Sequence, residues 1–301
     1  MTAVARRVAT RIAAAGLLVA FVAASCSSEP ESHDTRAHTD ATSLGRPDRV
    51  IAGPQGSTPQ FVVECGFSHS ASDDPIVYPD QPGQSHLHMF FGNTDVDAST
   101  TVADLAAGDT TCDDSSDKAA YWAPALLRGP EVLTPTKSVA YYRPGIDVVA
   151  QDVQPYPEGL VMIAGNSGAR GEQPLSIVAW GCGRGIVREA LPPTCAEGNN
   201  LELIITFPDC WDGENLDSAD HHGHVAYSSG GECPKGYPVH VPQLQFVVEY
   251  PVWGDPGGLL LASGGLLTGH ADFMNGWDQD VLAREVRLCL HNEVVCGLSS
   301  E

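Results

Sequence analysis

The order of apolar and polar residues predicts a chain made mostly of short strands. Several segments are rich in β-branched and aromatic residues and are bounded by glycine or proline, which is the pattern of strands separated by turns. With 31 glycines and 22 prolines, the chain has many turns and little room for long helices. We therefore expect a mainly β fold, a sandwich or jelly-roll-like core with long loops. The segments are 60–65, 119–127, 137–143, 160–164, 175–180, 201–207 and 244–250.

Two further segments predict short helices. Residues 100–107 are followed by Gly108, and a glycine just after the last helical residue commonly forms the C-cap. Residues 279–290 place their apolar side chains roughly on one face of a helix. These apolar residues are Val281, Leu282, Val286 and Leu290.

The first 25 residues have the organisation of a secretory signal peptide. Arginines precede an apolar run, residues 12–24, that is too short to span a bilayer as a stable helix. Small residues then lead to Cys26, as in a bacterial lipobox, so we expect a lipidated Cys26 that anchors the protein at the extracellular face of the membrane. The alternative is a plainly secreted protein. Residues 26–55 are polar and lack periodicity, which predicts a disordered tether, and residues 56–301 form one globular domain.

The charge of the chain limits its partners. The full chain carries 16 basic and 38 acidic residues, a net charge of −22. Removing residues 1–25 removes three arginines and no acid, so the mature chain has 13 − 38 = −25. Such a surface repels polyanions, which argues against nucleic acid as a partner. Neutral glycans, cations and basic partners stay open, and solubility alone also explains the acidity.

The cysteine count supports export. Apart from Cys26, the number of cysteines is even, which predicts disulfides in an oxidising compartment. Many pairings exist, and bonds between sequence neighbours are the simplest. That pairing leaves no thiol for nucleophilic catalysis or for binding a soft metal. The expected bonds are Cys65–Cys112, Cys182–Cys195, Cys210–Cys233 and Cys289–Cys296.

The residues of greatest chemical interest begin with His86 and His88. In an extended segment, residues i and i+2 point to the same face, so both imidazoles are offered to one point in space. Two imidazoles on one strand face are a common half-site for a divalent first-row metal ion. Two alternatives stay open. The pair faces a ligand without a metal, or one ring packs under Phe90 and Phe91 while the other hydrogen-bonds a loop carbonyl.

A second histidine-rich stretch spans residues 209–224. His222 and His224 share a face if this stretch is extended, and His224 precedes an apolar run. Asp212 follows Trp211 and a glycine comes next, so Asp212 is either a catalytic carboxylate or simply part of a tight turn. The stretch can also be a solvent-exposed loop without a functional role, and this interpretation suits His221 best.

The third stretch spans residues 270–277. His270 and Asp272 are again i and i+2, the arrangement of an oriented general base or of two metal ligands. Asn275 and Trp277 add an amide and an aromatic face that suit a sugar ring. The alternative is that Asp272 or Asn275 caps the helix that follows. Motifs for a nucleophile elbow, a phosphate loop, a dinucleotide site or a His-Glu-x-x-His helix are missing from the sequence.

The order of these motifs resembles one protein family. Residues 85–94, 121–126, 207–217, 224–227 and 270–277 together are similar to the secreted bacterial and fungal family named domain of unknown function nineteen-ninety-six, over nearly all of 60–290. The resemblance implies an extracellular domain, in fungi often joined to carbohydrate-binding or cell-wall modules, and it implies no established activity. It covers the motifs around His86, His88, Asp212, His224 and His270, whereas His221 and His222 lie where the family pattern varies.

Two hypotheses follow for the function. The first is an envelope hydrolase or lyase that acts on a cell-wall or environmental polysaccharide, and the second is a non-catalytic lipoprotein that binds a glycan or a metal ion. In both, one pocket holds His86, His88, His224, His270 and Asp272, and a separation of more than about 12 Å between the first two histidines and His270 would exclude it. The candidate catalytic residues are His86, His88, His270, Asp272 and Asp212; the ligand-binding candidates are Trp211, Asn275, Trp277 and Asn93; the candidate ligands of a divalent metal ion are His86, His88 and His224.

Overall fold

The computed structural model describes residues 50–51, 58–183 and 187–297. The predicted signal peptide, Cys26 and the predicted tether up to residue 49 lie outside the described residues. Within the predicted tether, β1 (Val50–Ile51) pairs with β18 (Val295–Cys296) near the other end of the described chain. Among the residues in these ranges, no helix is long and apolar enough to cross a membrane.

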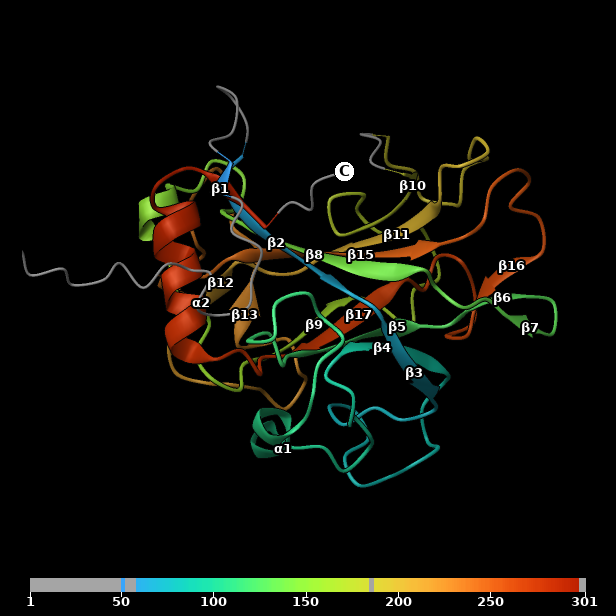
Figure 1. The fold of residues 1–301 in the computed structure, drawn as a ribbon, viewed down its shortest axis with the longest axis horizontal. Helices are drawn as coiled ribbons and strands as arrows, with labels where there is room; N and C mark the ends of the chain where they lie inside the picture. The colour runs from blue at the N-terminus through green and yellow to red at the C-terminus, as the bar shows by residue number, and fades with distance from the viewer. Residues whose placement is uncertain (1–49, 52–57, 184–186, 298–301) are drawn as a thin grey trace, which may run out of the picture. The chain divides into compact units, whose positions relative to one another are not determined.

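A seven-stranded sheet forms one layer of the fold (Figure 1). Its strands pair antiparallel, except that β18 runs parallel to its neighbour β2. The predicted strands at 60–65, 137–143, 175–180, 201–207 and 244–250 all lie in this sheet. In spatial order the strands are β1, β18, β2 (Gln60–Cys65), β8 (Lys137–Arg143), β15 (Gln243–Tyr250), β11 (Leu201–Thr206) and β10 (Val178–Cys182).

A five-stranded antiparallel sheet forms the second layer. The two sheets pack face to face through aromatic side chains: Phe246 lies 5.7 Å from Phe91 and stacks on Tyr121 at 5.4 Å between ring centroids. This arrangement confirms the predicted mainly β fold. In spatial order the strands are β3 (Phe67–Ala71), β4 (His88–Gly92), β5 (Ala120–Pro124), β17 (His270–Met274) and β9 (Val161–Gly165).

Smaller elements surround these layers. One three-stranded sheet consists of β13 (Val225–Ala226), β12 (Cys210–Trp211) and β14 (Val239–His240). Another consists of β16 (Leu259–Leu261), β6 (Leu126–Arg128) and β7 (Glu131–Val132). The helical segments are α1 (Val102–Ala107), the 3₁₀-helix η2 (Ala150–Asp152), α2 (Gln279–Glu285) and the π-helix η3 (Val286–Leu290).

Both predicted helices are present, with shifted boundaries. Gly108 caps α1 as expected, and the backbone N–H of Thr101 donates to the carboxylate of Asp104 at the other end. The second helix changes from α to π at Val286, a local widening that hydrophobic periodicity does not reveal. Its N-cap is Asp278, whose Oδ1 accepts the backbone N–H groups two and three residues on. The expectation that Asp272 or Asn275 caps this helix is therefore wrong.

Four disulfides join the cysteines as neighbour pairing predicts. The bonds are Cys65–Cys112, Cys182–Cys195, Cys210–Cys233 and Cys289–Cys296. They leave none of these cysteines as a thiol, and they fit a protein that folds in an oxidising compartment.

Alternation along β4 and β17 decides which side chains face outward. Met89 and Phe91 of β4 and Phe273 of β17 enter the core between the sheets. Because successive side chains point to opposite faces, His88 and His270 lie on the outer face of the five-stranded sheet. Apolar residues of the loops after β3 and β4 cover part of that face, so the outward side chains are buried as well.

Candidate metal centre

Three histidines meet on the outer face of the five-stranded sheet. The ring centroids of His86 and His88 are 4.2 Å apart, and those of His270 lie 5.0 Å from His86 and 5.8 Å from His88. His88 and His270 come from β4 and β17, the two neighbours of β5, and Pro124 of β5 pairs with His88. The prediction that these three side chains share one site is confirmed in its geometry.

Backbone carbonyls fix the protonation of two of the rings. Nδ1 of His88 lies 2.9 Å from the carbonyl oxygen of Asp73, and Nδ1 of His270 lies 2.9 Å from that of Thr268. A carbonyl only accepts, so each Nδ1 carries the proton and donates it. Each Nε2 is then left with a free lone pair, which is the form of histidine that binds a metal ion.

Burial keeps the three imidazoles neutral. Burial lowers the pKa of His270 to about 4, and it lowers the pKa of His86 as well. Burial, reinforced by charge repulsion from His86 and His270, holds the pKa of His88 well below its usual value. Because proton loss precedes metal binding at a histidine, rings that are already neutral at pH 7 bind a cation without that competition.

The free nitrogens are costly without a ligand. Nε2 of His86 and Nε2 of His88 are buried and have no hydrogen-bond partner among the described residues. An orphaned buried polar atom costs about 1–3 kcal/mol. Such a cost is retained where a bound group satisfies the atoms.

The spacing of the donors fits one first-row ion. Ligand atoms of the three histidines lie within 4.8 Å of one another. An equilateral triangle of that size has its centre about 2.8 Å from each corner, so small side-chain adjustments reach the ~2.0–2.1 Å of a zinc–nitrogen bond. Neutral imidazoles suit zinc, copper, nickel or iron, whereas magnesium and calcium prefer oxygen ligands.

A buried carboxyl lies beside the three-histidine cluster. Asp272 follows His270 by two positions on β17, and its Oδ2 is buried without a hydrogen-bond partner among the described residues. Burial, and then the nearby charge of Asp74, raises the pKa of Asp272 well above its usual value. The register places Asp272 in one row with the apolar Trp122 and Phe90. Asp272 is therefore a buried carboxyl in an apolar row of the sheet, an environment that favours its protonated form.

The cluster opens into a cleft of about 550 Å³. Hydrogen bonds from the backbone of Gly223 and the hydroxyl of Ser218 lower the pKa of Asp220 to about 2, so one wall carries a fixed negative charge. His222 stands beside it. The lining residues include Asp74, Tyr78, Ser85, His86, Asn166, Ser167, Asp220, His221, His222, His270 and Asp272.

Gly165 of β9 permits the close approach of strands beside the cluster. It pairs with His270, its φ is +83°, and an added Cβ would lie 2.5 Å from the carbonyl oxygen of Gly269. Any side chain at this position would therefore push β9 away from His270.

His224 does not join the cluster, so its assignment as a metal ligand is corrected. Its Nε2 donates to the carbonyl oxygen of Val161 at 2.7 Å, and its Nδ1 lies 3.0 Å from the hydroxyl of Ser218. Both nitrogens are occupied by protein groups, and the ring fastens the segment before β13 to β9.

Other residues that the sequence predicts to be catalytic or ligand-binding have structural roles. Oδ1 of Asp212 accepts hydrogen bonds from the backbone N–H groups of Glu214 and Asn215, so Asp212 stabilises a turn. The indole N–H of Trp211 donates to the carbonyl of Asn215 at 2.6 Å in the same turn. Trp277 is only 3 % exposed and therefore offers no face to a sugar.

The two amides of the assigned set are buried and bind the backbone. Nδ2 of Asn93 donates to the carbonyl of Leu105 at 3.0 Å, and Nδ2 of Asn275 donates to the carbonyl of Pro157 at 2.8 Å. These side chains fasten loops to the sheet instead of facing the cleft.

Several residues of the cleft are not in the predicted site, among them Asp74, Asp220 and His222. The sequence does not indicate that Asp74 lines the cleft. Its carboxylate accepts hydrogen bonds from the backbone N–H groups of Ile76 and Val77, as an ordinary turn residue does. The histidine-dense stretch did mark Asp220 and His222, but an extended conformation was the wrong assumption for them. The chain turns there, and His221 has a φ of +57°.

Fold and site together define a class: a disulfide-stapled β-sandwich protein with a buried three-histidine cluster at the base of a polar cleft. Comparison with families narrows this class. The family described as Domain of unknown function (DUF1996) matches residues 74–277, and the chain belongs to it. Comparison with curated proteins and with solved structures finds no match.

Proposed function

We propose that this protein is an extracellular metal-dependent hydrolase or lyase that acts on a polysaccharide. The observation that carries the proposal is the convergence of His86, His88 and His270 with neutral rings and free Nε2 atoms beside an open cleft. Three protein ligands with one open position are the pattern of catalytic zinc sites, whereas structural sites are closed by a fourth protein ligand.

The residues have separable tasks in this proposal. The three histidines hold a divalent first-row ion, which supplies Lewis-acid polarisation of a substrate oxygen or lowers the pKa of water. Asp272 carries a proton in its buried site and donates it to the leaving oxygen. Burial keeps that proton on Asp272, and the nearby charge of Asp74 adds to the effect because it disfavours a second carboxylate.

The lining of the cleft supports a hydroxyl-rich substrate. Tyr78, Asn166 and Ser167 offer hydroxyl and amide groups, and Asp220 offers a carboxylate, all of which hydrogen-bond sugar hydroxyls. The net charge of −22 disfavours a polyanionic substrate. A neutral cell-wall or environmental polysaccharide suits both features.

The disulfides and the predicted lipid site bear on where the protein is located. The disulfides fit a compartment outside the cytoplasm. We propose further that the protein is held at the membrane through a lipid on Cys26, which the small residues before it at the end of the apolar run support.

One observation favours a second candidate, a non-catalytic metal-binding lipoprotein. His88 and His270 are 0 % and 4 % exposed, so only His86 gives the cluster a broad path to the cleft. The tryptophans proposed for sugar stacking are engaged elsewhere. A site that only holds an ion needs neither feature.

Activity assays on the exported protein separate the two candidates. Neutral polysaccharides are incubated with wild type and with Asp272→Asn, and new reducing ends or unsaturated products are measured. The proposal expects cleavage that a chelator abolishes and zinc or copper restores. It also expects a loss of 10²-fold or more in Asp272→Asn with metal content unchanged, because the amide keeps the neutral shape but has no acidic proton. Metal bound without any cleavage selects the binding lipoprotein, and activity unchanged in Asp272→Asn contradicts the role of this carboxyl.

A further inference from the structure

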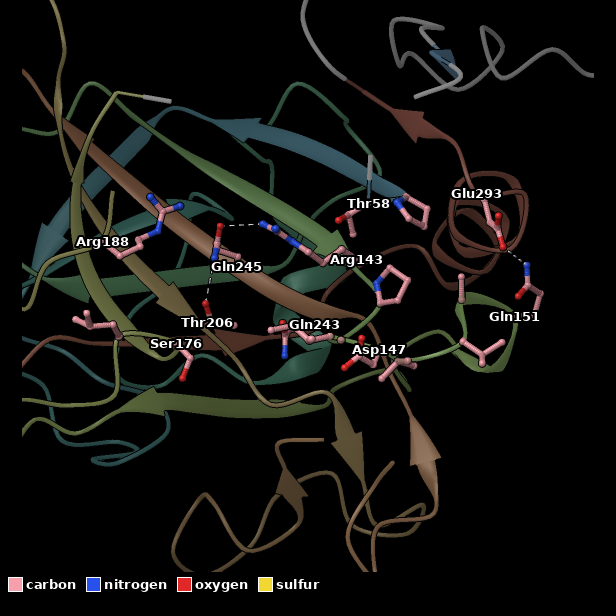
Figure 2. A pocket seen from close by; sticks show the side chains of 18 residues that line it. Thr58, Arg143, Asp147, Gln151, Ser176, Arg188, Thr206, Gln243, Gln245 and Glu293 are labelled. Atoms are coloured by element: carbon pink, nitrogen blue, oxygen red, sulfur yellow. Dashed lines mark hydrogen bonds between the residues drawn. The ribbon is translucent and has the colours of Figure 1, made fainter. Parts of the chain in front are cut away.

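A second pocket lies on the outer face of the seven-stranded sheet and shares no lining residue with the three-histidine cleft. Figure 2 shows its floor, where β8, β15 and β11 run side by side. Its volume is about 750 Å³, within the range of small-molecule sites. The loop 144–151, which directly follows β8, forms one of its walls.

Hydrogen bonds across three strands fix a guanidinium in this floor. Arg143 is the last residue of β8, and its neighbour Tyr142 points into the core, so Arg143 points outward into the pocket. One Nη of Arg143 donates to Oε1 of Gln245 at 2.8 Å, and Nε2 of Gln245 donates to the hydroxyl of Thr206 at 3.2 Å. The guanidinium is therefore held in place before any ligand arrives (Figure 2).

The cation of Arg143 has no carboxylate partner among the described residues. Its Nε is buried and makes no hydrogen bond. Burial lowers the pKa of Arg143, the nearby Tyr141 raises it, and the charge of Arg188 lowers it. A desolvated charge without a counter-ion is costly, and this chain has 38 acidic residues that could have supplied one. The arrangement indicates that an anion from outside completes it.

The rim of the same pocket is aliphatic. Ile146, Val149 and Leu175 are 76 %, 56 % and 45 % exposed. Among the described residues, none that lines the pocket is aromatic, so a sugar ring finds no stacking surface on them. An aliphatic chain, in contrast, would pack against Ile146 and Val149, which belong to the same 144–151 wall.

The acidic residues of the lining limit the ligand to one charged group. Glu293 accepts a hydrogen bond from Gln151 at 3.1 Å, seen at the right-hand side of Figure 2. Asp147 lies on the 144–151 wall. A second acidic group on the ligand would meet repulsion from these carboxylates.

We propose that this pocket binds a small aliphatic carboxylate, with its acidic head on Arg143 and its tail along Ile146 and Val149 of the 144–151 wall. The planar fork of a guanidinium matches the two oxygens of a carboxylate, and the guanidinium of Arg143 lines the pocket. The positive charge of Arg188 strengthens the attraction for the head. This inference is independent of the three-histidine site.

Calorimetric titration of the exported protein with octanoate, acetate and 1-octanol tests the proposal. We expect octanoate to bind at least 10-fold more tightly than acetate, which lacks the tail, and than 1-octanol, which lacks the charge. Arg143→Met should weaken octanoate by 10-fold or more without lowering the melting temperature of the ligand-free protein, because it removes a desolvated cation. Arg170→Met, the same substitution at an exposed arginine outside the pocket, should change neither quantity.

Several outcomes would overturn the proposal. These are no octanoate binding to wild type, equal binding of octanoate and 1-octanol or of octanoate and acetate, and unchanged affinity in Arg143→Met. If Arg143→Met does not fold, Arg143→Lys decides instead. It keeps the charge but loses the fork, so octanoate affinity should fall about 10-fold, and an unchanged affinity would sink the assignment.

Discussion

Replacing His86 with alanine should separate metal binding from stability. His86 makes no hydrogen bond to the described residues, and its Nε2 is buried and orphaned. Removing the ring relieves the ~1–3 kcal/mol cost of that orphan and loses ring packing of similar size. In a chelator, the free energy of unfolding of His86→Ala should therefore stay within about 1 kcal/mol of wild type.

His69→Ala is the matched control on the same sheet. Nδ1 of His69 lies 2.9 Å from the hydroxyl of Ser68, its Nε2 lies 2.8 Å from the carbonyl of Val96, and its ring stacks on Phe90 at 4.8 Å. Losing two hydrogen bonds and a ring stack should cost about 2–4 kcal/mol with or without metal.

Urea unfolding in chelator and in zinc gives the comparison. At a zinc concentration 100 times the dissociation constant, wild type should gain about 2.7 kcal/mol. His69→Ala should keep this gain and His86→Ala should lose most of it. A destabilisation of His86→Ala in chelator as large as that of His69→Ala, or a full gain from zinc in His86→Ala, would contradict this prediction.

Three further predictions concern the rest of the molecule. In chelator, acidification from pH 6.5 to 4 should destabilise wild type by about 3 kcal/mol more than His270→Asn. Burial lowers the pKa of His270 to about 4, so over this range only the unfolded state takes up the proton and stability falls as pH falls; equal pH slopes by chemical unfolding would contradict this. Removing the disulfide Cys65–Cys112, whose cysteines are 47 residues apart, should lower the free energy of unfolding by about 4 kcal/mol. Removing Cys289–Cys296, whose cysteines are 7 residues apart, should lower it by only about 2.4 kcal/mol, because the closed loop is shorter. The reverse order in denaturant unfolding would contradict this expectation. Cys26→Ser should release the protein from the membrane fraction, and retention there with unchanged gel mobility would exclude the lipid anchor.

The core of the site follows from the sequence because strand periodicity is local. His86 with His88, and His270 with Asp272, each needed only an extended backbone to share a face. What brings the two pairs together is the order β4-β5-β17, in which segments more than 170 residues apart flank one strand, and no local pattern encodes that order. The carbonyl of Asp73 that fixes the ring of His88 belongs to a loop and carries no side-chain signal.

The wrong assignments have a common physical cause. A buried His, Trp or Asn that satisfies the backbone has the same residue type as one that faces a ligand. His224 donates a hydrogen bond to the carbonyl oxygen of Val161, and Trp277 donates one to the hydroxyl of Tyr142 at 3.1 Å inside the core. Only the position of the partner distinguishes these roles, and tertiary structure sets that position.

The metal content of the exported protein tests the central claim most directly. Protein loaded with zinc or copper and then dialysed is analysed for metal per chain, alongside His88→Ala, His270→Ala and the control His69→Ala. The three-histidine centre predicts one ion per chain in wild type and in His69→Ala, and almost none in the other two variants. Wild type without metal, or full occupancy in His88→Ala and His270→Ala, would contradict it.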